Sequence, residues 1–236
     1  MDQEDDEEGD FTTAAALKKL FLAHEKPQTH TLVHEQLIGL NCNDFYENYL
    51  ADGAKYSFAK FYEKRGENEV ACENWSDPKT TEEKVYDGKP VLKQRKLTMK
   101  VNVNSTFVKV APTTKYFKIL ERSPTMIILR MLNRTADIPY CATFGVEEEW
   151  FLASPSSDSA KCAVLRMSFQ IIWYQSTLMK SVIKNNTDPE TKKVMGELMD
   201  EIIGKNGHNF VERVPKPKIK PAEVQKKPQV IDQRAK

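Results

Sequence analysis

The chain has 236 residues, of which 40% are hydrophobic and 29% charged, and its formal net charge is +1. This length can hold one large domain or two small ones, and the composition is typical of a folded domain with a core. The near-zero charge gives the whole protein a weak field. No apolar run approaches the roughly 18–20 residues that a membrane-spanning helix needs, so we expect no transmembrane segment within these residues.

The charges are concentrated at the two ends. Residues 1–10 hold seven acids and no base, and residues 211–236 hold eight Lys or Arg and three acids. We expect a disordered acidic tail at 1–12, a folded domain at 28–207, and a disordered Lys/Pro-rich basic tail at 211–236. The basic tail has no aromatic residue to stack on bases, so we expect no nucleic-acid partner.

The predicted elements begin with a helix over Thr13–His24 and a strand from His30 to about Ile38. Two short helices then follow. Asp44 is a natural N-cap for the first, which ends near Gly53. The second covers about Ala54–Lys64 and stops at Gly66.

The hydrophobic period then changes from 3.6 to 2. The clearest alternation has Leu97, Met99, Val101 and Val103 on one side and polar residues on the other. Strands are expected at Val70–Trp75, Lys96–Val103, Thr113–Arg122, Thr125–Asn133, Phe144–Leu152 and Lys161–Tyr174. The last element is a helix over Thr177–Lys205, which Pro189 is expected to kink or restart, with Thr187 or Asp188 as the new N-cap.

This order predicts an α+β fold with one antiparallel sheet. One face of the sheet must be covered. A single long helix can cover a curved sheet, but it cannot fill the concavity of a wide one. The space left over becomes a mostly apolar cavity, which is the usual form of a small-molecule site.

Candidates for catalysis and for metal binding are few. No Ser or Cys has a recognisable base partner, and Glu147–Glu149 is interpreted as an exposed charge run, so we expect no enzyme. His30 and His34 could share a face of the first strand, but two ligands without a third are a weak metal signal. We expect neither metal nor cofactor.

Cysteine usage and the acidic N-terminus favour a reducing compartment. The N-terminus lacks the basic and then apolar pattern of a secretory signal. The four cysteines form no C-x-x-C pair, so we expect free thiols and a cytoplasmic location. They are Cys42, Cys72, Cys141 and Cys162.

Several stretches, in this order and spacing, resemble one known family. They are Phe45–Leu50 with Phe58–Gly66 and Trp75, the Asp137–Tyr140 turn with Phe144 and Trp150, and Met179–Asn185. They resemble the VASt domain, the StAR-related, lipid-transfer-like domain of Aster and Lam proteins, from His30 to Ile203. The resemblance implies a helix-grip (START-like) fold: a curved antiparallel sheet around a long C-terminal helix, with two short helices after the first strand. It also implies a sterol held between sheet and helix and carried between membranes.

The resemblance and the strand alternation together give candidate site residues. The cavity would be lined by Leu97, Met99, Val101, Val103, Leu165, Met167, Phe169, Ile171, Trp173 and Val182. In the family, the loop that corresponds to Asn104–Pro112 acts as a lid. Here the lid and membrane contact would be Phe107, Val108, Lys109 and Val110, beside rim lysines Lys100, Lys109 and Lys115.

The sequence thus favours non-enzymatic binding and intermembrane transfer of a sterol or similar lipid, with transient contact to an anionic membrane surface. The protein would then be peripheral at membranes or membrane contact sites. One alternative is a protein-interaction module whose cavity is filled by side chains. Another is a small-molecule enzyme on the same scaffold, which would need an inward-facing acid or His.

Overall fold

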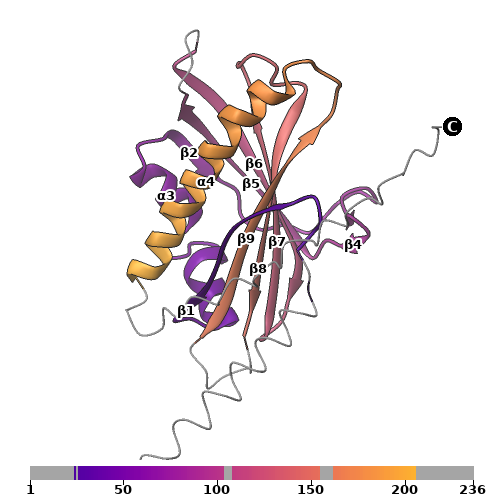
Figure 1. The fold of residues 1–236 in the computed structure, drawn as a ribbon. Helices are drawn as coiled ribbons and strands as arrows, with labels where there is room; N and C mark the ends of the chain where they lie inside the picture. Colours follow the sequence, from indigo (N-terminus) through magenta and orange to yellow (C-terminus); the bar gives the residue numbers. More distant parts are fainter. Residues whose placement is uncertain (1–23, 25, 104–107, 155–161, 206–236) are drawn as a thin grey trace, which may run out of the picture.

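The computed structural model describes residues 24, 26–103, 108–154 and 162–205 (Figure 1). The helix expected at Thr13–His24 falls almost entirely outside this part of the chain, as do the two tails. The tail predictions therefore stay predictions.

The described residues form one seven-stranded antiparallel sheet in the order β1-β9-β8-β7-β6-β5-β2. Its strands are β1 Thr31–Ile38, β2 Asn68–Cys72, β5 Lys93–Asn102, β6 Val110–Arg122, β7 Met126–Thr135, β8 Phe144–Ala153 and β9 Ala163–Trp173. From β5 to β9 each strand pairs with the next along the chain, and β1 closes one edge by pairing with β9. A small hairpin, β3 Val85–Tyr86 and β4 Lys89–Pro90, lies between β2 and β5 in sequence.

The two expected short helices are present, with different starting residues. The first comprises α2, Cys42–Phe45, which continues into the π-helical turn η1, Tyr46–Leu50. Its N-cap is Asn41, not Asp44, because the Asn41 side chain accepts a 2.8 Å hydrogen bond from the Asp44 backbone N–H. The second helix, α3 Phe58–Lys64, is shorter than expected because Ser57 caps it.

The last helix, α4 Lys180–Lys205, runs through Pro189 as one element of 26 residues, so the expected restart is wrong. Proline removes one backbone hydrogen bond and crowds the preceding turn. Pro189 itself is exposed, and α4 is anchored on both sides of it. Ile183 is buried before it, and Met195, Leu198, Met199 and Ile202 after it.

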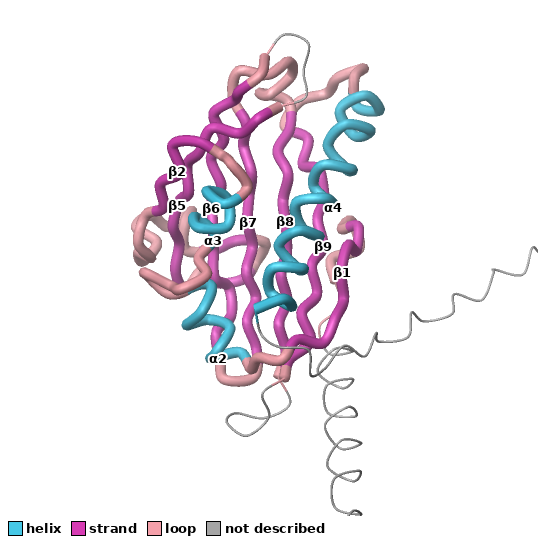
Figure 2. Tube along the Cα trace, turned by 90° about the vertical axis from the view of Figure 1, so that its left-hand side faces the viewer, coloured by secondary structure: helices cyan, strands magenta, loops and turns pink. Residues whose placement is uncertain are grey.

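α4 and the short helices cover the same face of the sheet, as the two views agree (Figures 1 and 2). We call this the inner face. Phe45, Phe58 and Phe61 pack there against the alternate residues of β5 to β9 and the lower turns of α4. The α+β, helix-grip prediction is confirmed: a curved antiparallel sheet holds a long C-terminal helix.

Candidate functional site

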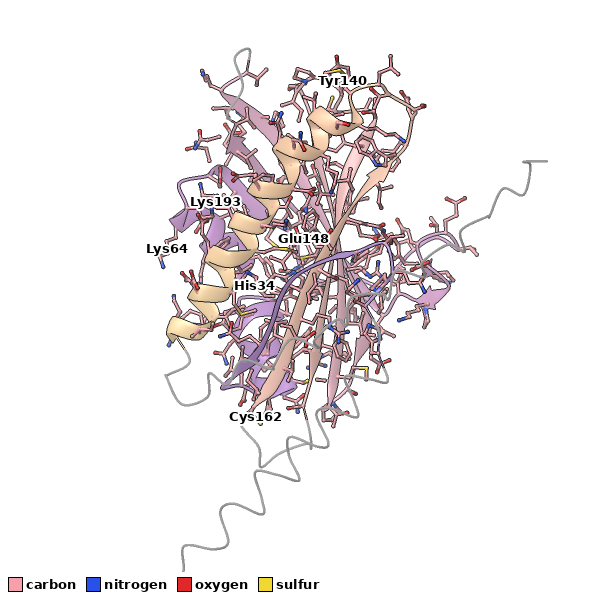
Figure 3. All side chains as sticks on the ribbon, in the orientation of Figure 1. His34, Lys64, Tyr140, Glu148, Cys162 and Lys193 are labelled. Atoms are coloured by element: carbon pink, nitrogen blue, oxygen red, sulfur yellow. The ribbon has the colours of Figure 1, made fainter. Side chains whose placement is uncertain are left out.

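The sheet has two distinct ends along its strands. At the upper end lie residues 103 and 108–109, the loop 136–143 and the connection 174–179 into α4. Figure 3 marks this end with Tyr140 and the opposite end with Cys162, and it places Glu148 at mid-height.

The residues predicted to line a cavity come from strands near the two edges of the sheet. Leu97, Met99 and Val101 of β5 and Leu165, Met167 and Phe169 of β9 join one core cluster on the inner face. Ile171 and Trp173 continue the β9 alternation, and Val103 follows β5 half-buried. Strands β6, β7 and β8 separate the two groups. Contact of these residues with a lipid remains a prediction.

Val182 does not face the sheet. It is 50% exposed, whereas the next residue, Ile183, is 7% exposed and turned inward. Of the proposed lid, Phe107 lies outside the described residues, Val108 is half-buried and Val110 is 42% exposed.

Burial on the inner face falls toward the upper end. On β9, Leu165, Met167 and Phe169 are at most 1% exposed, while Ile171 and Trp173 are only half-buried. On α4, which is described throughout, no residue between Ile183 and Met195 is buried. The lower half is thus a packed core, and the half-buried part near the upper end is the candidate site. This upper inner face comprises Val101, Asn133, Thr135, Phe144, Ile171 and Trp173.

A group of buried polar side chains lies directly below this region. The Lys115 ammonium is 2.8 Å from Glu148 Oε1, and the two residues are 3% and 5% exposed. Asn133 Nδ2 donates to Glu148 Oε1 at 2.6 Å, and Trp150 Nε1 donates to Oε2 at 3.3 Å. Tyr62 of α3 completes this polar cluster, with its ring 5.4 Å from the Lys115 ammonium.

The orientation of the Asn133 amide is determined by its neighbour. A carboxylate only accepts hydrogen bonds, so the NH₂ group must face Glu148 and the carbonyl oxygen must face away. That oxygen, Oδ1, is buried and has no hydrogen-bond partner among the described residues. An unmatched buried acceptor is unfavourable and is satisfied by a water or by a ligand donor.

The polar cluster corrects two expectations. Lys115 is not a rim lysine but an interior one, because it points inward between Thr113 and Phe117 in the alternation of β6. The acidic run is not exposed: Glu147, Glu148 and Glu149 are at most 5% exposed.

Glu147 and Glu149 point to the outer face, opposite to Glu148. There Arg130 donates to both carboxylates at 2.8 Å, and His30 and Tyr86 hydrogen-bond Glu147. Burial alone would raise the pKa of Glu147, but the hydrogen bonds from His30, Tyr86 and Gln170 and the charge of Arg130 outweigh it and lower the pKa to about 2. This outer cluster attaches the β3–β4 hairpin to the sheet.

His30 and His34 do not share a face. A bulge between Leu32 and His34 changes the register, so His30 bonds Ser168 and Glu147 on the outer face. His34 lies on the inner face, where its Nε2 would be 3.6 Å from a Cβ placed on Gly196 of α4. Burial lowers the pKa of His34. No cluster of metal-ligating side chains occurs within the described ranges.

The inward-facing acid that a catalytic reading requires is present, as Glu148. Its two oxygens accept from Lys115, Asn133 and Trp150, so the carboxylate is held by three donors. Sequence reasoning missed this role although a signal existed. Glu148 occupies the same alternation as Val146 and Trp150, which are apolar and inward-facing.

A curved antiparallel sheet that holds one long C-terminal helix defines the helix-grip, START-like class of domain. The chain belongs to the VASt family, the VAD1 Analog of StAR-related lipid transfer domain, whose model matches residues 32–188. The chain matches no curated protein. Across the described residues, no helix combines the length and apolarity needed to cross a bilayer.

Proposed function

We propose that this domain binds a sterol, or a lipid of similar shape with one small hydroxyl head, and carries it between membranes without making a bond. The lipid body would lie on the upper inner face under α4. The observation that carries the proposal is Asn133 Oδ1, a buried acceptor without a partner among the described residues. A lipid hydroxyl could donate to it, while Glu148 fixes the amide from the other side.

The energetics suit a carrier. A sterol that buries roughly 500 Å² would gain on the order of 12 kcal/mol from removal of apolar surface from water. Association costs of about 4–15 kcal/mol remove a large share of that gain. The net affinity would hold a lipid in water and still release it to a membrane.

The buried ion pair below the site favours a lipid with a hydroxyl head over a lipid with a charged head. The two charges below the site, Lys115 and Glu148, neutralise each other at 2.8 Å. A phosphate or carboxylate head would have to disrupt this pair inside a buried region, which is costly. A hydroxyl needs only one acceptor and leaves the pair intact.

The test measures binding of a fluorescent sterol delivered from cyclodextrin, and its transfer between two liposome populations. Saturable binding and transfer are expected for the native sequence. A sterol that lacks its hydroxyl should bind about tenfold more weakly, the value of one hydrogen bond. Absence of sterol binding by folded protein would contradict the proposal and favour an interaction module with a filled core.

The variant Asn133→Leu tests whether the lipid hydroxyl lies beside Asn133. This variant should lose about tenfold in affinity for the sterol but bind the hydroxyl-free analogue as the native protein does, because both changes remove the same hydrogen bond. Asn68→Leu, the same chemical change at an exposed position of β2, is the matched control. If Asn133→Leu weakens the binding of both sterols by the same factor, Asn133 does not contact the hydroxyl.

A further inference from the structure

Exposed apolar side chains gather at the upper end of the domain. In the described part of the chain, nine large hydrophobic residues are exposed, and five of them surround this end. They are Val110, Tyr140, Tyr174, Leu178 and Val182. Single exposed apolar residues are ordinary, but a group of them around one opening indicates an interaction surface.

Two of these residues lie at the start of α4, one just before it and one in its first turn. Leu178 is fully exposed and Val182 is 50% exposed. Helical hydrogen bonding begins at the Met179 carbonyl, which accepts from the Ile183 N–H at 2.9 Å, so Leu178 lies in the turn directly before α4. Val182 lies in the first turn of α4. Met179 and Ile183 occupy the inward side, so the exposed pair is not part of the core.

Basic residues accompany this exposed pair. Lys180 and Lys184 are exposed, and the Lys180 ammonium lies 5.2 Å from the ring centroid of Trp173. Lys184 forms an ion pair with Asp188. A cationic end above an apolar stem or ring is the arrangement that suits the boundary between lipid tails and headgroups.

We infer that Leu178 and Val182 insert into an anionic membrane surface and turn the upper end of the domain toward it. This inference rests on the proposed lipid transfer and assigns membrane contact to the start of α4. A leaflet suits the surface because lysines flank the apolar pair. A second copy of the chain suits it less, since a two-fold contact would oppose these lysines, and two side chains cover far less than the roughly 1,000 Å² that a stable interface needs.

The experiment is flotation with vesicles of phosphatidylcholine containing about one fifth phosphatidylserine. Leu178→Asp should weaken vesicle binding about tenfold or more, the value of one lost apolar side chain plus an added repulsive charge. Leu32→Asp, an exposed leucine on β1 away from this end, should bind as the native protein does. Equal binding by Leu178→Asp and the native protein would overturn the inference.

A second variant, which adds apolar surface at the same position, tests the inference even if Leu178→Asp fails to fold. Leu178→Trp should bind the vesicles more tightly, and its added emission should shift to the blue on binding, because tryptophan favours the membrane interface. Leu32→Trp should show no shift. An unchanged spectrum for Leu178→Trp, or a native dimer that Leu178→Asp dissociates in sedimentation, would also overturn the inference.

Binding of sterol delivered from cyclodextrin separates the proposed function from the membrane contact of Leu178 and Val182. Leu178→Asp should bind delivered sterol as tightly as the native protein, since Leu178 lies outside the site. If no variant binds sterol while vesicle binding still depends on Leu178, the proposed function fails and the membrane contact stands. If all variants bind sterol and vesicle binding does not depend on Leu178, the proposed function stands and the membrane contact fails.

Discussion

Lys115 of β6 and Glu148 of β8 form a buried ion pair across an intervening strand, with Nζ and Oε1 2.8 Å apart. The strand between them, β7, contributes Asn133, which bonds the same carboxylate oxygen. Burial alone would lower the pKa of Lys115, but the Glu148 carboxylate and the Tyr62 hydroxyl outweigh it, so the pKa is raised above its ordinary value. The ammonium therefore stays charged, and three central strands are joined beneath the candidate site.

Removal of one partner should be strongly destabilising. We expect Lys115→Met to lower the free energy of unfolding by about 3–5 kcal/mol, because Glu148 would remain buried without its cation. Urea denaturation followed by tryptophan emission measures the change.

The double variant Lys115→Met with Glu148→Gln is the control. It replaces the charges by neutral groups and should recover most of the loss, since no uncompensated charge remains. A loss in the double variant equal to the sum of the single losses would show that the two side chains contribute independently and that the pair is not coupled.

The outer cluster predicts an acid-dependent stability. The folded-state pKa of Glu147, about 2, is below its ordinary value, so ionised Glu147 stabilises the fold. This contribution is fully present above about pH 5 and is lost as the pH falls toward 2, with a magnitude on the order of 3 kcal/mol. Urea denaturation at pH 6 and pH 3 measures the larger part of this contribution.

Glu147→Gln is the matched variant for this prediction. It should be less stable than the native protein at pH 6, and its stability should fall less between pH 6 and pH 3. Parallel pH profiles for the two proteins would mean that other acids cause the loss. Glu149 is the first to examine, because its pKa is also lowered: burial opposes the shift, and His24 and Arg130 outweigh it.

Most of the fold could be predicted from local pattern. The alternation in β5 and β9 is complete because each strand has one face against the helices, and that face must be apolar. The helix boundaries were less certain, since Asn41 and Asp44 are both good N-caps and only the hydrogen bond distinguishes them. The effect of Pro189 on the last helix is smaller than its sequence predicts, because packing on both sides of it outweighs its local penalty.

The polar part of the site was only partly visible in the local pattern, which places Glu148 on the inward side of β8 but does not show its partner. Lys115 and Glu148 are 33 positions apart, and a charge in an alternating strand usually indicates a solvent-facing position. Whether an inward charge is tolerated depends on a partner from another strand, so it becomes visible only in three dimensions. The bulge that separates His30 from His34 is likewise a feature of pairing with β9.

Val110→Asp should slow lipid transfer without unfolding the domain. Val110 is the first residue of β6 at the upper end and is 42% exposed, so the charge meets water in the free protein. At a membrane the same charge would oppose insertion beside an anionic leaflet. We expect a transfer rate several-fold lower and an unfolding free energy within about 0.5 kcal/mol of the native value.

Thermal unfolding and liposome transfer on the same preparations test that pair of expectations. Val85→Asp, at an exposed valine of the β3–β4 hairpin, is the control for added charge. Loss of the fold in Val110→Asp would mean that this residue belongs to the core and not to a membrane-facing rim.

Gly145 on the outer face of β8 accommodates a specific contact near the upper end. A Cβ at this position would lie 2.7 Å from the Tyr174 hydroxyl and 3.1 Å from Cδ of Arg134. The Arg134 guanidinium lies over the Tyr174 ring, 4.4 Å from its centroid. Gly145→Ala should therefore displace this pair and lower the free energy of unfolding by about 1 kcal/mol, as overpacking does.

Tyr174→Phe removes the atom that Gly145→Ala would meet first. In that background the alanine should be tolerated, with a loss below about 0.5 kcal/mol in urea denaturation, because the nearest clash is gone. Gly204→Ala, in the last turn of α4, meets no atom within 4 Å and should be neutral or slightly stabilising,. If Gly145→Ala is equally destabilising with tyrosine and phenylalanine at 174, the restriction comes from Arg134 or Leu132, whose Cδ1 would lie 3.2 Å away.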